Sequence, residues 1–434
     1  MAFQQGLSGL GVSSKALDVT SHNIANASTV GYKGANAHFG DVYAAALNGG
    51  GASQIGIGVN LAAVQQQFNQ GNITTTNNPL DISINGAGFF RMDKSGATTY
   101  TRNGQFHLDK SGFIVNDQGM KLTGYIAQGG VITAATPAPL QIDSSAIPPV
   151  ATGSNPTSSF KGVKANLSLD SRATTTGMLP WGTPAPVAGQ PWTPDPKSYN
   201  WSTALTTFDS LGNPHNLTMY FRKAATAGDW EIYANVDGTD AALSPLSSNA
   251  LNFDTSGKLT TTMPLNISID LNGINAALGK PVNAAVAPLT FDIDLTGTGQ
   301  YGQAFGTNRL EQDGYAPGNL VGLSVGADGV VQGRYSNGKS FAQGQVVLTN
   351  FTNPNGLLSM GNNQWVETSD SGPPLVGAPQ TSSLGTLTAA SVEESNVDLT
   401  AELVNLITFQ RNYQANAQSI KTQDQIMQTI VNLR

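Results

Sequence analysis

The chain has 434 residues, a formal net charge of -7 and no cysteine. Only 11% of its residues are charged, against about 25% in ordinary globular proteins. The acidic balance argues against nucleic-acid binding, which requires a basic surface, and the absence of cysteine excludes disulfides and zinc–thiolate sites.

Residues 1–30 are predicted to form a helix with one narrow apolar stripe. Apolar residues recur every seven positions with one intermediate member, which is typical of a helix that meets another helix along a seam. Ser14 and Ser21 occupy other intermediate positions, so the seam is weak, and the helix should end near Gly31. No basic and apolar leader opens the chain, so we expect no cleaved signal peptide. The stripe consists of Phe3, Leu7, Leu10, Leu17 and Ile24.

The middle of the chain is predicted to be mainly β. From Asn78 the apolar period changes to two, and short strands alternate with Gly- and Asn-containing turns. The same pattern returns near residues 330–348. We therefore expect a discontinuous β-domain formed by residues 78–155 with 297–385, preceded by a connecting segment, 31–77.

Residues 156–296 are predicted to form an inserted outer β-domain. Within it, residues 180–196, the Pro/Trp segment, contain six prolines together with Trp181 and Trp192. One interpretation is a sugar- or peptide-binding surface, because indole rings stack on sugars. The other, which we favour, is a rigid loop that two indoles hold to its own domain.

The C-terminal region, 386–434, is predicted to hold a second helix with a longer apolar stripe. Ser395 and Asn396 are N-cap candidates, and Asp398 and Glu402 fall in the first turns. Because both stripes are too narrow to stabilise the helices alone, we expect other copies of the chain to supply the missing burial. The stripe includes Leu399, Leu403, Leu406, Tyr413, Ile420 and Met427.

No pattern of catalytic or ligand-binding residues emerges. The four histidines are scattered, with no pair at helical spacing. Asp292–Gly297 faintly resembles the start of a calcium loop, but Gln303 stands where the bidentate acid belongs. We therefore expect no enzyme activity, no cofactor and no metal, and without a run of about 20 apolar residues we expect no membrane insertion.

Three blocks of sequence resemble the flagellar rod, hook and hook-associated proteins. They are the segment around HNIANASTVGYK, the segments NNPLDISINGAGFF and YTRNGQFHLD, and the C-terminal segment around SNVDL and QRNY. The motif residues that carry the terminal resemblance are Asn23, Ile24, Ala25, Asn26, Gly31, Tyr32, Lys33, Ser395, Asn396, Val397, Asp398, Leu399, Gln410, Arg411 and Tyr413.

The resemblance implies a fold of coiled-coil-like terminal helices with mainly-β domains between them. Residues 208–213, with Tyr220, Phe221 and Trp230, favour the hook members over the shorter distal rod proteins; another axial protein, or less readily a secreted adhesin, remains the alternative. A hook subunit would be exported without a cleaved signal and would polymerise outside the cell into a torque-transmitting joint around an export channel.

The implied partners are copies of itself, the distal rod protein, the hook cap, the hook–filament junction proteins and the export apparatus. A tube that bends as it turns needs hinged connections, for which residues 49–58 and Gly385 are candidates.

Overall fold

The computed structural model describes residues 2–42, 56–185, 187, 190–239, 250–281 and 284–432. Most of the candidate hinge 49–58 lies outside these residues. The chain divides into two compact units, and the second is larger than the expected insert, 156–296. The first unit comprises Met1–Ser144, Gly322–Arg334 and Ser340–Arg434, and the second comprises Ser145–Val321 and Tyr335–Lys339.

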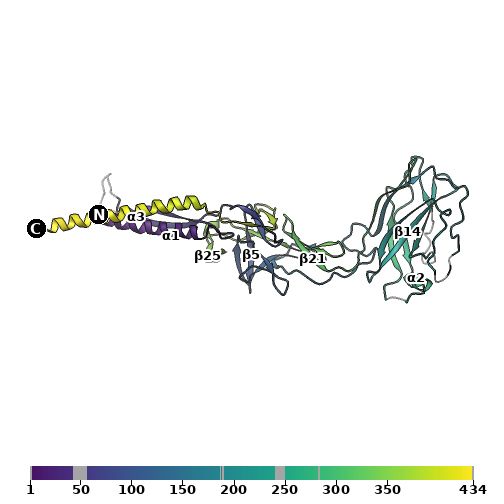
Figure 1. Ribbon diagram of the computed structural model, residues 1–434, viewed down its shortest axis with the longest axis horizontal. Coiled ribbons are helices and arrows are strands. Elements are labelled where there is room, and N and C mark those ends of the chain that lie inside the picture. Colours follow the sequence, from purple (N-terminus) through teal and green to yellow (C-terminus); the bar gives the residue numbers. More distant parts are fainter. Residues whose placement is uncertain are drawn as a thin grey trace. The chain divides into compact units, whose positions relative to one another are not determined.

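Two helices lie side by side in the first unit: α1 (Ala2–Ala25) and α3 (Leu399–Asn432) (Figure 1). With the strands between them, they confirm the predicted terminal helices and mainly-β middle. α1 ends before Gly31, because residues 26–31 form tight turns. The N-cap of α3 is Asp398, not Ser395 or Asn396: its Oδ1 accepts hydrogen bonds from the backbone N–H of Thr400 and Ala401, at 2.9 and 3.2 Å.

Residues 31–77 are more than a connection. β1 (Ala35–Val42) and β2 (Gly58–Gln66) form an antiparallel ribbon that packs against α1. Further along, β3 (Ile73–Thr75) pairs with β29 (Ser391–Glu393). β4 (Ile82–Asn85) pairs with β28 (Thr386–Ala389) in the same way, so the residues just before α3 are strands.

A fourteen-stranded sheet forms the main β-structure of the first unit, and its path runs β21-β22-β23-β9-β5-β6-β26-β25. An aromatic cluster of Phe89, Tyr100, Phe351 and Trp365 is buried against it. The strands on the path are β5 (Phe89–Lys94), β6 (Ala97–Thr101), β9 (Lys121–Gln128), β21 (Leu320–Val325), β22 (Val330–Tyr335), β23 (Ser340–Val346), β25 (Leu358–Gly361) and β26 (Gln364–Val366). Off the path lie β7 (His107–Leu108), β8 (Ile114–Val115), β10 (Val131–Ile132), β11 (Ala138–Pro139), β24 (Leu348–Asn350) and β27 (Leu375–Gly377), with the 3₁₀ turn η1 (Pro354–Gly356) before β25.

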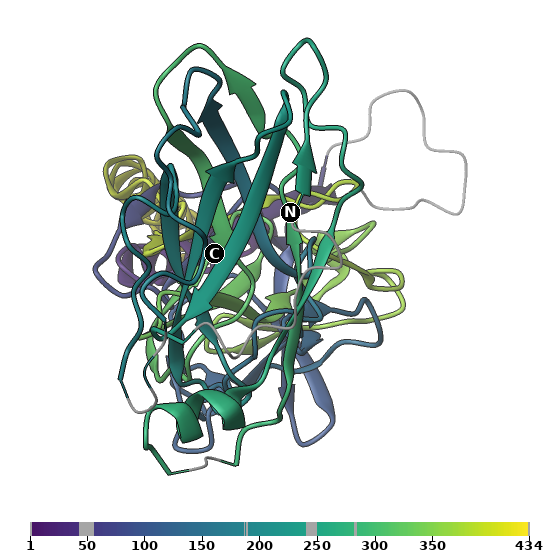
Figure 2. The same ribbon diagram turned by 90° about the vertical axis from the view of Figure 1, so that its right-hand side faces the viewer.

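The second unit has two sheets that share one apolar core (Figure 2). Leu217, Phe221 and Trp230 from one sheet join Val163 and Ile293 from the other. The first sheet contains β12 (Gly162–Asp170), β17 (Leu265–Ile269), β18 (Leu289–Asp294), β19 (Gly299–Tyr301) and β20 (Gly306–Gln312). The second contains β13 (Trp201–Phe208), β14 (Pro214–Lys223), β15 (Asp229–Val236) and β16 (Ala250–Asn252), and the short helix α2 (Leu271–Ala277) follows β17.

The described residues of the Pro/Trp segment, 180–185, 187 and 190–196, pack against their own unit. Trp181 stacks on Tyr233, with ring centroids 4.3 Å apart, and meets Trp192 edge to face at 5.5 Å. Trp192 is buried, and its Nε1–H donates a hydrogen bond to the carbonyl oxygen of Pro184. These contacts favour the rigid-loop interpretation over an open binding surface.

Gly385, the other candidate hinge, is tightly packed. A Cβ at this position would lie 2.4 Å from the backbone oxygen of Asn85, and the Gly385 N–H donates to the oxygen of Ala87 at 2.8 Å. Glycine at this position therefore allows the backbone at Gly385 to lie in close contact with the backbone at Asn85.

Candidate assembly interface

Small residues let α1 and α3 approach closely. A Cβ at Gly6 would lie 3.0 Å from Cγ1 of Ile420, and one at Gly9 would lie 2.9 Å from Nδ2 of Asn416. Ser13 continues the same buried face of α1, as do Ala16 and Thr20. The contact between the helices within one chain therefore uses the small face of α1.

The predicted apolar stripe of α1 lies on a different face. Each residue advances the helix by roughly 100°, so this stripe is displaced by about a quarter turn from the small face. Phe3 and Leu7 are 51% and 55% exposed, and the other three members are only half-buried. Leu10, Leu17 and Ile24 are those three.

The predicted stripe of α3 is also incompletely covered. None of the α3 side chains that the structure describes is buried. Leu406 and Ile420 are half-buried on the side near α1, whereas the rest of the stripe is exposed. The exposed members are Leu399, Leu403, Tyr413 and Met427, together with Val431 at a further intermediate position of the same repeat. Three apolar residues outside the predicted stripe are exposed as well: Val404, Ile407 and Ile426.

The first motif forms the turn by which the chain leaves α1. Asn23 is buried; its Nδ2–H donates to the oxygen of Ala35 at 2.8 Å, and its Oδ1 accepts from the Ala35 N–H at 2.9 Å. Asn26 donates through Nδ2 to the oxygen of His22 at 3.0 Å and covers the end of the helix. Ile24 is half-buried and Ala25, the last residue of α1, is exposed. These asparagines close the helix and bind the following strand to it.

Gly31 and Tyr32 complete this turn. Gly31 has a φ of +70°, and a Cβ there would lie 2.6 Å from the backbone nitrogen of Asn103, so two constraints require glycine. The Tyr32 hydroxyl donates to Asn23 Oδ1 at 3.2 Å. Burial, and to a lesser degree the charge of Glu402, raises the pKa of Tyr32 to about 12, so this donor keeps its proton.

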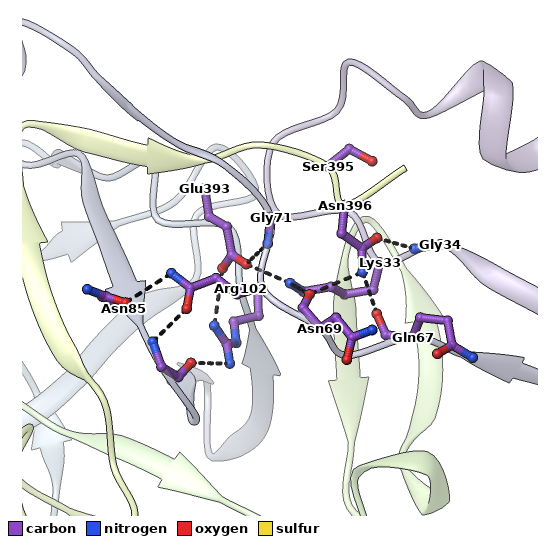
Figure 3. Close-up of polar contacts among 12 residues, drawn as sticks. Lys33, Gly34, Gln67, Asn69, Gly71, Asn85, Arg102, Glu393, Ser395 and Asn396 are labelled. Carbon is purple, nitrogen blue, oxygen red and sulfur yellow. Dashed lines mark hydrogen bonds and ion pairs between the residues drawn. The ribbon is translucent and has the colours of Figure 1, made fainter. Parts of the chain in front are cut away.

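A buried ion network links the segment that follows α1 to the segment that precedes α3 (Figure 3). Lys33 Nζ lies 2.6 Å from Glu393 Oε1, and both side chains are 0% exposed. Arg102 Nη1 lies 3.2 Å from Glu393 Oε2. The Lys33 ammonium also donates to the oxygen of Asn69 at 2.7 Å, and the Gly71 N–H donates to Glu393 Oε1 at 2.9 Å. One carboxylate therefore holds two cations and a backbone amide.

The network carries one more positive charge than negative. Burial lowers the pKa of Lys33, and the charge of Glu393 opposes this only in part. Burial likewise lowers the pKa of Arg102, again against the effect of Glu393. Glu393 is therefore the single anion in this network that compensates both desolvated cations.

The second motif fastens the start of α3 to the same region. Asn396 accepts the Gly34 N–H through Oδ1 at 2.8 Å and donates through Nδ2 to the oxygen of Gln67 at 2.7 Å. Ser395 Oγ accepts the N–H of Val397 at 3.3 Å. Together with the cap by Asp398, these bonds fix where α3 leaves the β-structure.

The structure thus brings together the motif residues 23–33 and 395–398, but not all of the predicted site. Gln410, Arg411 and Tyr413 lie exposed in the middle of α3, away from this turn. Glu393 and Arg102 were missed. In the sequence, each is only a charged residue at the edge of an apolar strand, in a chain with few charges. That signal does not identify the residue with which it pairs.

No helix in the described part of the chain is both long and apolar enough to cross a membrane. Among the same residues, no three His, Asp or Glu side chains are grouped so that they could hold a metal ion.

Family models match four parts of the chain and define its class, the flagellar rod and hook proteins. Residues 3–33 match "Flagella basal body rod protein" and 388–433 match "Flagellar basal body rod FlgEFG protein C-terminal". Residues 83–150 match "Flagellar hook protein FlgE/F/G D1 domain". Residues 169–315 match "Flagellar basal body protein FlaE D2 domain".

Full-length relatives define the family. The chain is 40% identical to the flagellar hook protein FlgE of Salmonella typhimurium over 443 residues, which cover 100% of both chains. It is also 40% identical to that of Escherichia coli, with the same coverage, and 30% identical to that of Treponema pallidum, over 99% of this chain and 98% of the other. The chain belongs to the flagellar hook protein family.

Among solved structures, the flagellar hook protein FlgE2 of Helicobacter pylori has a similar fold. The TM-score is 0.51 at 14% identity, over 74% of this chain and 100% of that one.

Proposed function

We propose that this chain is the structural subunit of a bacterial flagellar hook, and that it polymerises through the apolar stripes of α1 and α3. The observation that carries the proposal is the orientation of these stripes. The intrachain contact uses the small face of α1, so Phe3 and Leu7 of α1 stay exposed. Leu403 of α3 is exposed as well. Exposed apolar surface of this kind marks an interaction site, and membership of the hook family supports further copies of the chain as its occupant.

In the polymer, the stripes would pack in a coiled-coil-like manner. Their spacing of seven residues suits helices that meet along a seam, and every α3 side chain that the structure describes is at least partly available for such contacts. The interface comprises Phe3, Leu7, Leu10, Leu17, Ile24, Leu399, Leu403, Leu406, Tyr413, Ile420 and Met427.

We assign residues 1–30 and 386–434 to an inner domain, whose helical part consists of α1 and α3. The β-domains, 78–155 with 297–385 and 156–296, would lie outside it, and 31–77 would connect the two layers. The β1–β2 ribbon packed on α1 supports a rigid connection.

The distal rod protein, the hook cap, the junction proteins and the export apparatus are the proposed partners. In this assignment the chain leaves the cell without a cleaved signal and acts outside it as a non-enzymatic joint around the export channel. Its membership of the hook family supports this assignment.

The test introduces one charge into the stripe and the same charge elsewhere on the helix. Leu403→Asp should raise the critical concentration for polymerisation on the order of a hundredfold, because an unpaired carboxylate would be buried between helices. Ser419→Asp is the matched control: Ser419 is exposed on the opposite side of α3 and should leave assembly unchanged.

Sedimentation and electron microscopy of the purified full chain at rising concentration would measure both variants. Tubes formed equally well by Leu403→Asp would refute the stripe as the interface. A wild-type chain that never forms tubes, alone or on a hook template, would refute the function itself.

A further inference from the structure

His215 in the second unit lies between two carboxylates that belong to different turns. Its Nδ1 lies 2.7 Å from Asp237 Oδ2, and its Nε2 lies 3.6 Å from Asp209 Oδ2. The His215 side chain is 8% exposed and that of Asp209 is 0% exposed. None of these residues contributes to the proposed assembly interface.

Each carboxylate also fixes its own turn. Asp209 Oδ1 accepts the N–H groups of Leu211 and Asn213, at 2.9 and 2.8 Å, and so closes the turn between β13 and β14. Asp237 Oδ1 accepts the Asn216 N–H at 2.8 Å. Asp237 has a φ of +51°, a conformation unfavourable for a residue with a side chain, so the turn after β15 relies on such contacts.

The turn after β15 holds the Pro/Trp segment. The Trp192 N–H donates to the oxygen of Gly238, the residue after Asp237. Asn235, two residues before Asp237, donates through Nδ2 to the oxygen of Trp192 at 3.1 Å. A Cβ at Gly238 would lie 2.9 Å from Cβ of Pro191, so the two backbones are in close contact.

The Pro/Trp segment in turn covers aromatic side chains of the second sheet. Trp181 stacks on Tyr233 of β15 and contacts Tyr220 of β14, with ring centroids 5.3 Å apart from the latter. Phe221 and Ile232, which alternate with these tyrosines along the strands, face the core. The described residues of the segment therefore cover part of the outer face of this sheet.

We propose that His215 is a pH-operated latch, which in its protonated form holds the turn after β15 and, through it, residues 190–196 of the Pro/Trp segment closed over the outer face of the sheet. Loss of the proton weakens the ion pairs with Asp237 and Asp209 and allows these residues to open.

The surrounding charges set the direction of the response. The hydrogen bond that His215 donates to Asp237, helped by the charges of Asp237 and Asp209, raises the pKa of His215 although burial opposes it. Burial acts to raise the pKa of Asp237, but the bonds from His215 and the Asn216 N–H outweigh it, and Lys280 adds a weaker effect in the same direction, so this pKa is lowered. At Asp209, burial likewise acts to raise the pKa, but the hydrogen bonds from Asn213 and the Leu211 N–H outweigh it, so this pKa is also lowered.

A histidine whose folded pKa exceeds its unfolded value stabilises the closed form fully below the unfolded pKa of about 6.5. That contribution is lost as the pH rises through the folded pKa. The latch is therefore closed in mildly acidic solution and weakens on the alkaline side.

Hydrogen exchange of the full chain, kept dilute and monomeric, tests this between pH 5.5 and 9. After correction for the intrinsic exchange rate, hydrogen exchange gives the equilibrium constant for opening at the non-proline amides of residues 190–198. This constant should rise up to tenfold for each pH unit between the unfolded and folded pKa values of His215. Exchange of the imidazole C2 hydrogen, followed by mass spectrometry, gives the pKa of His215 in the same samples. The two midpoints should agree, and amide protection that is constant over this range or follows another midpoint would overturn the latch.

His215→Gln should leave residues 190–198 weakly protected at every pH and abolish the pH dependence. His107→Gln is the matched control, because His107 is exposed in the first unit beside Asp117, at 3.8 Å, and should retain the wild-type profile. If the pH dependence survives in His215→Gln, the latch is refuted, and the wild-type titration decides the question should this variant fail to fold.

Discussion

At the scale of single residues, the Glu393 side chain connects the segment after α1 to the end of β6 and to the segment before α3. It pairs with both Lys33 and Arg102, and all three side chains are almost fully buried. Its backbone oxygen also accepts the N–H of Gly31 at 2.8 Å, so the same residue secures the turn after α1. The neighbouring Glu394 is exposed, which gives an internal comparison one position away.

Glu393→Gln should destabilise the first unit by about 3–5 kcal/mol, because two buried cations would lose their only anion. Urea unfolding, followed by hydrogen exchange in peptides that contain β3 and β29, measures the loss. Glu394→Gln should change the midpoint little, and equal stability of the two variants would contradict the role assigned to Glu393.

The sequence identified many of the motif residues but not what they contact. Asn23, Gly31 and Asn396 stood out because their segments resemble flagellar proteins. Their physical roles could not be predicted, since each depends on a partner far along the chain: Gly31 on Asn103, and Asn396 on Gly34 and Gln67. The Lys33–Glu393 pair was missed for the same reason.

At the scale of elements, long periodic segments were the most predictable. The seven-residue apolar spacing located α3 almost to its ends, whereas its cap was placed two or three residues too early, because Ser395, Asn396 and Asp398 are all good capping residues. The β1–β2 ribbon went unrecognised, since the Gly-rich sequence between its two strands is typical of a linker and the strands bury little surface. The apolar residues alone could not predict which face of α1 contacts α3, because that contact uses Gly6 and Gly9, which have no side chain.

We expect α1 and α3 to exchange their amide hydrogens rapidly in the dilute monomer and slowly in the polymer. Their contact within one chain relies on small side chains, and α3 buries none of the side chains that the structure describes, so isolated pairing should be weak. Hydrogen exchange on both forms measures this difference.

β5, which is mostly buried at Phe89, Phe90 and Met92, should be protected in both states and serves as the internal control. Slow exchange at residues 3–24 and 399–431 in the monomer would show that the helices are already stable without neighbours.

At the scale of the whole molecule, each compact unit has a β-core of its own, and the helices are attached to the first through residues 31–34 and 393–398. A fragment of residues 31–398 keeps Lys33, Glu393 and Asn396 but lacks both stripes. It should remain folded and monomeric at concentrations where the full chain polymerises, which gel filtration with light scattering would measure. Polymers of this fragment would place the main interface in the β-domains.

The close approach of Gly6 to Ile420 has a consequence for folding order. These residues lie near opposite ends of the chain, so their contact closes a loop that includes almost every other residue, and the entropic cost of closing a loop grows with its length. Local hairpins such as β5–β6 close short loops and should form first. Pairing of α1 with α3 should therefore be the last step of folding, after the intervening β-structure has brought the two ends of the chain together.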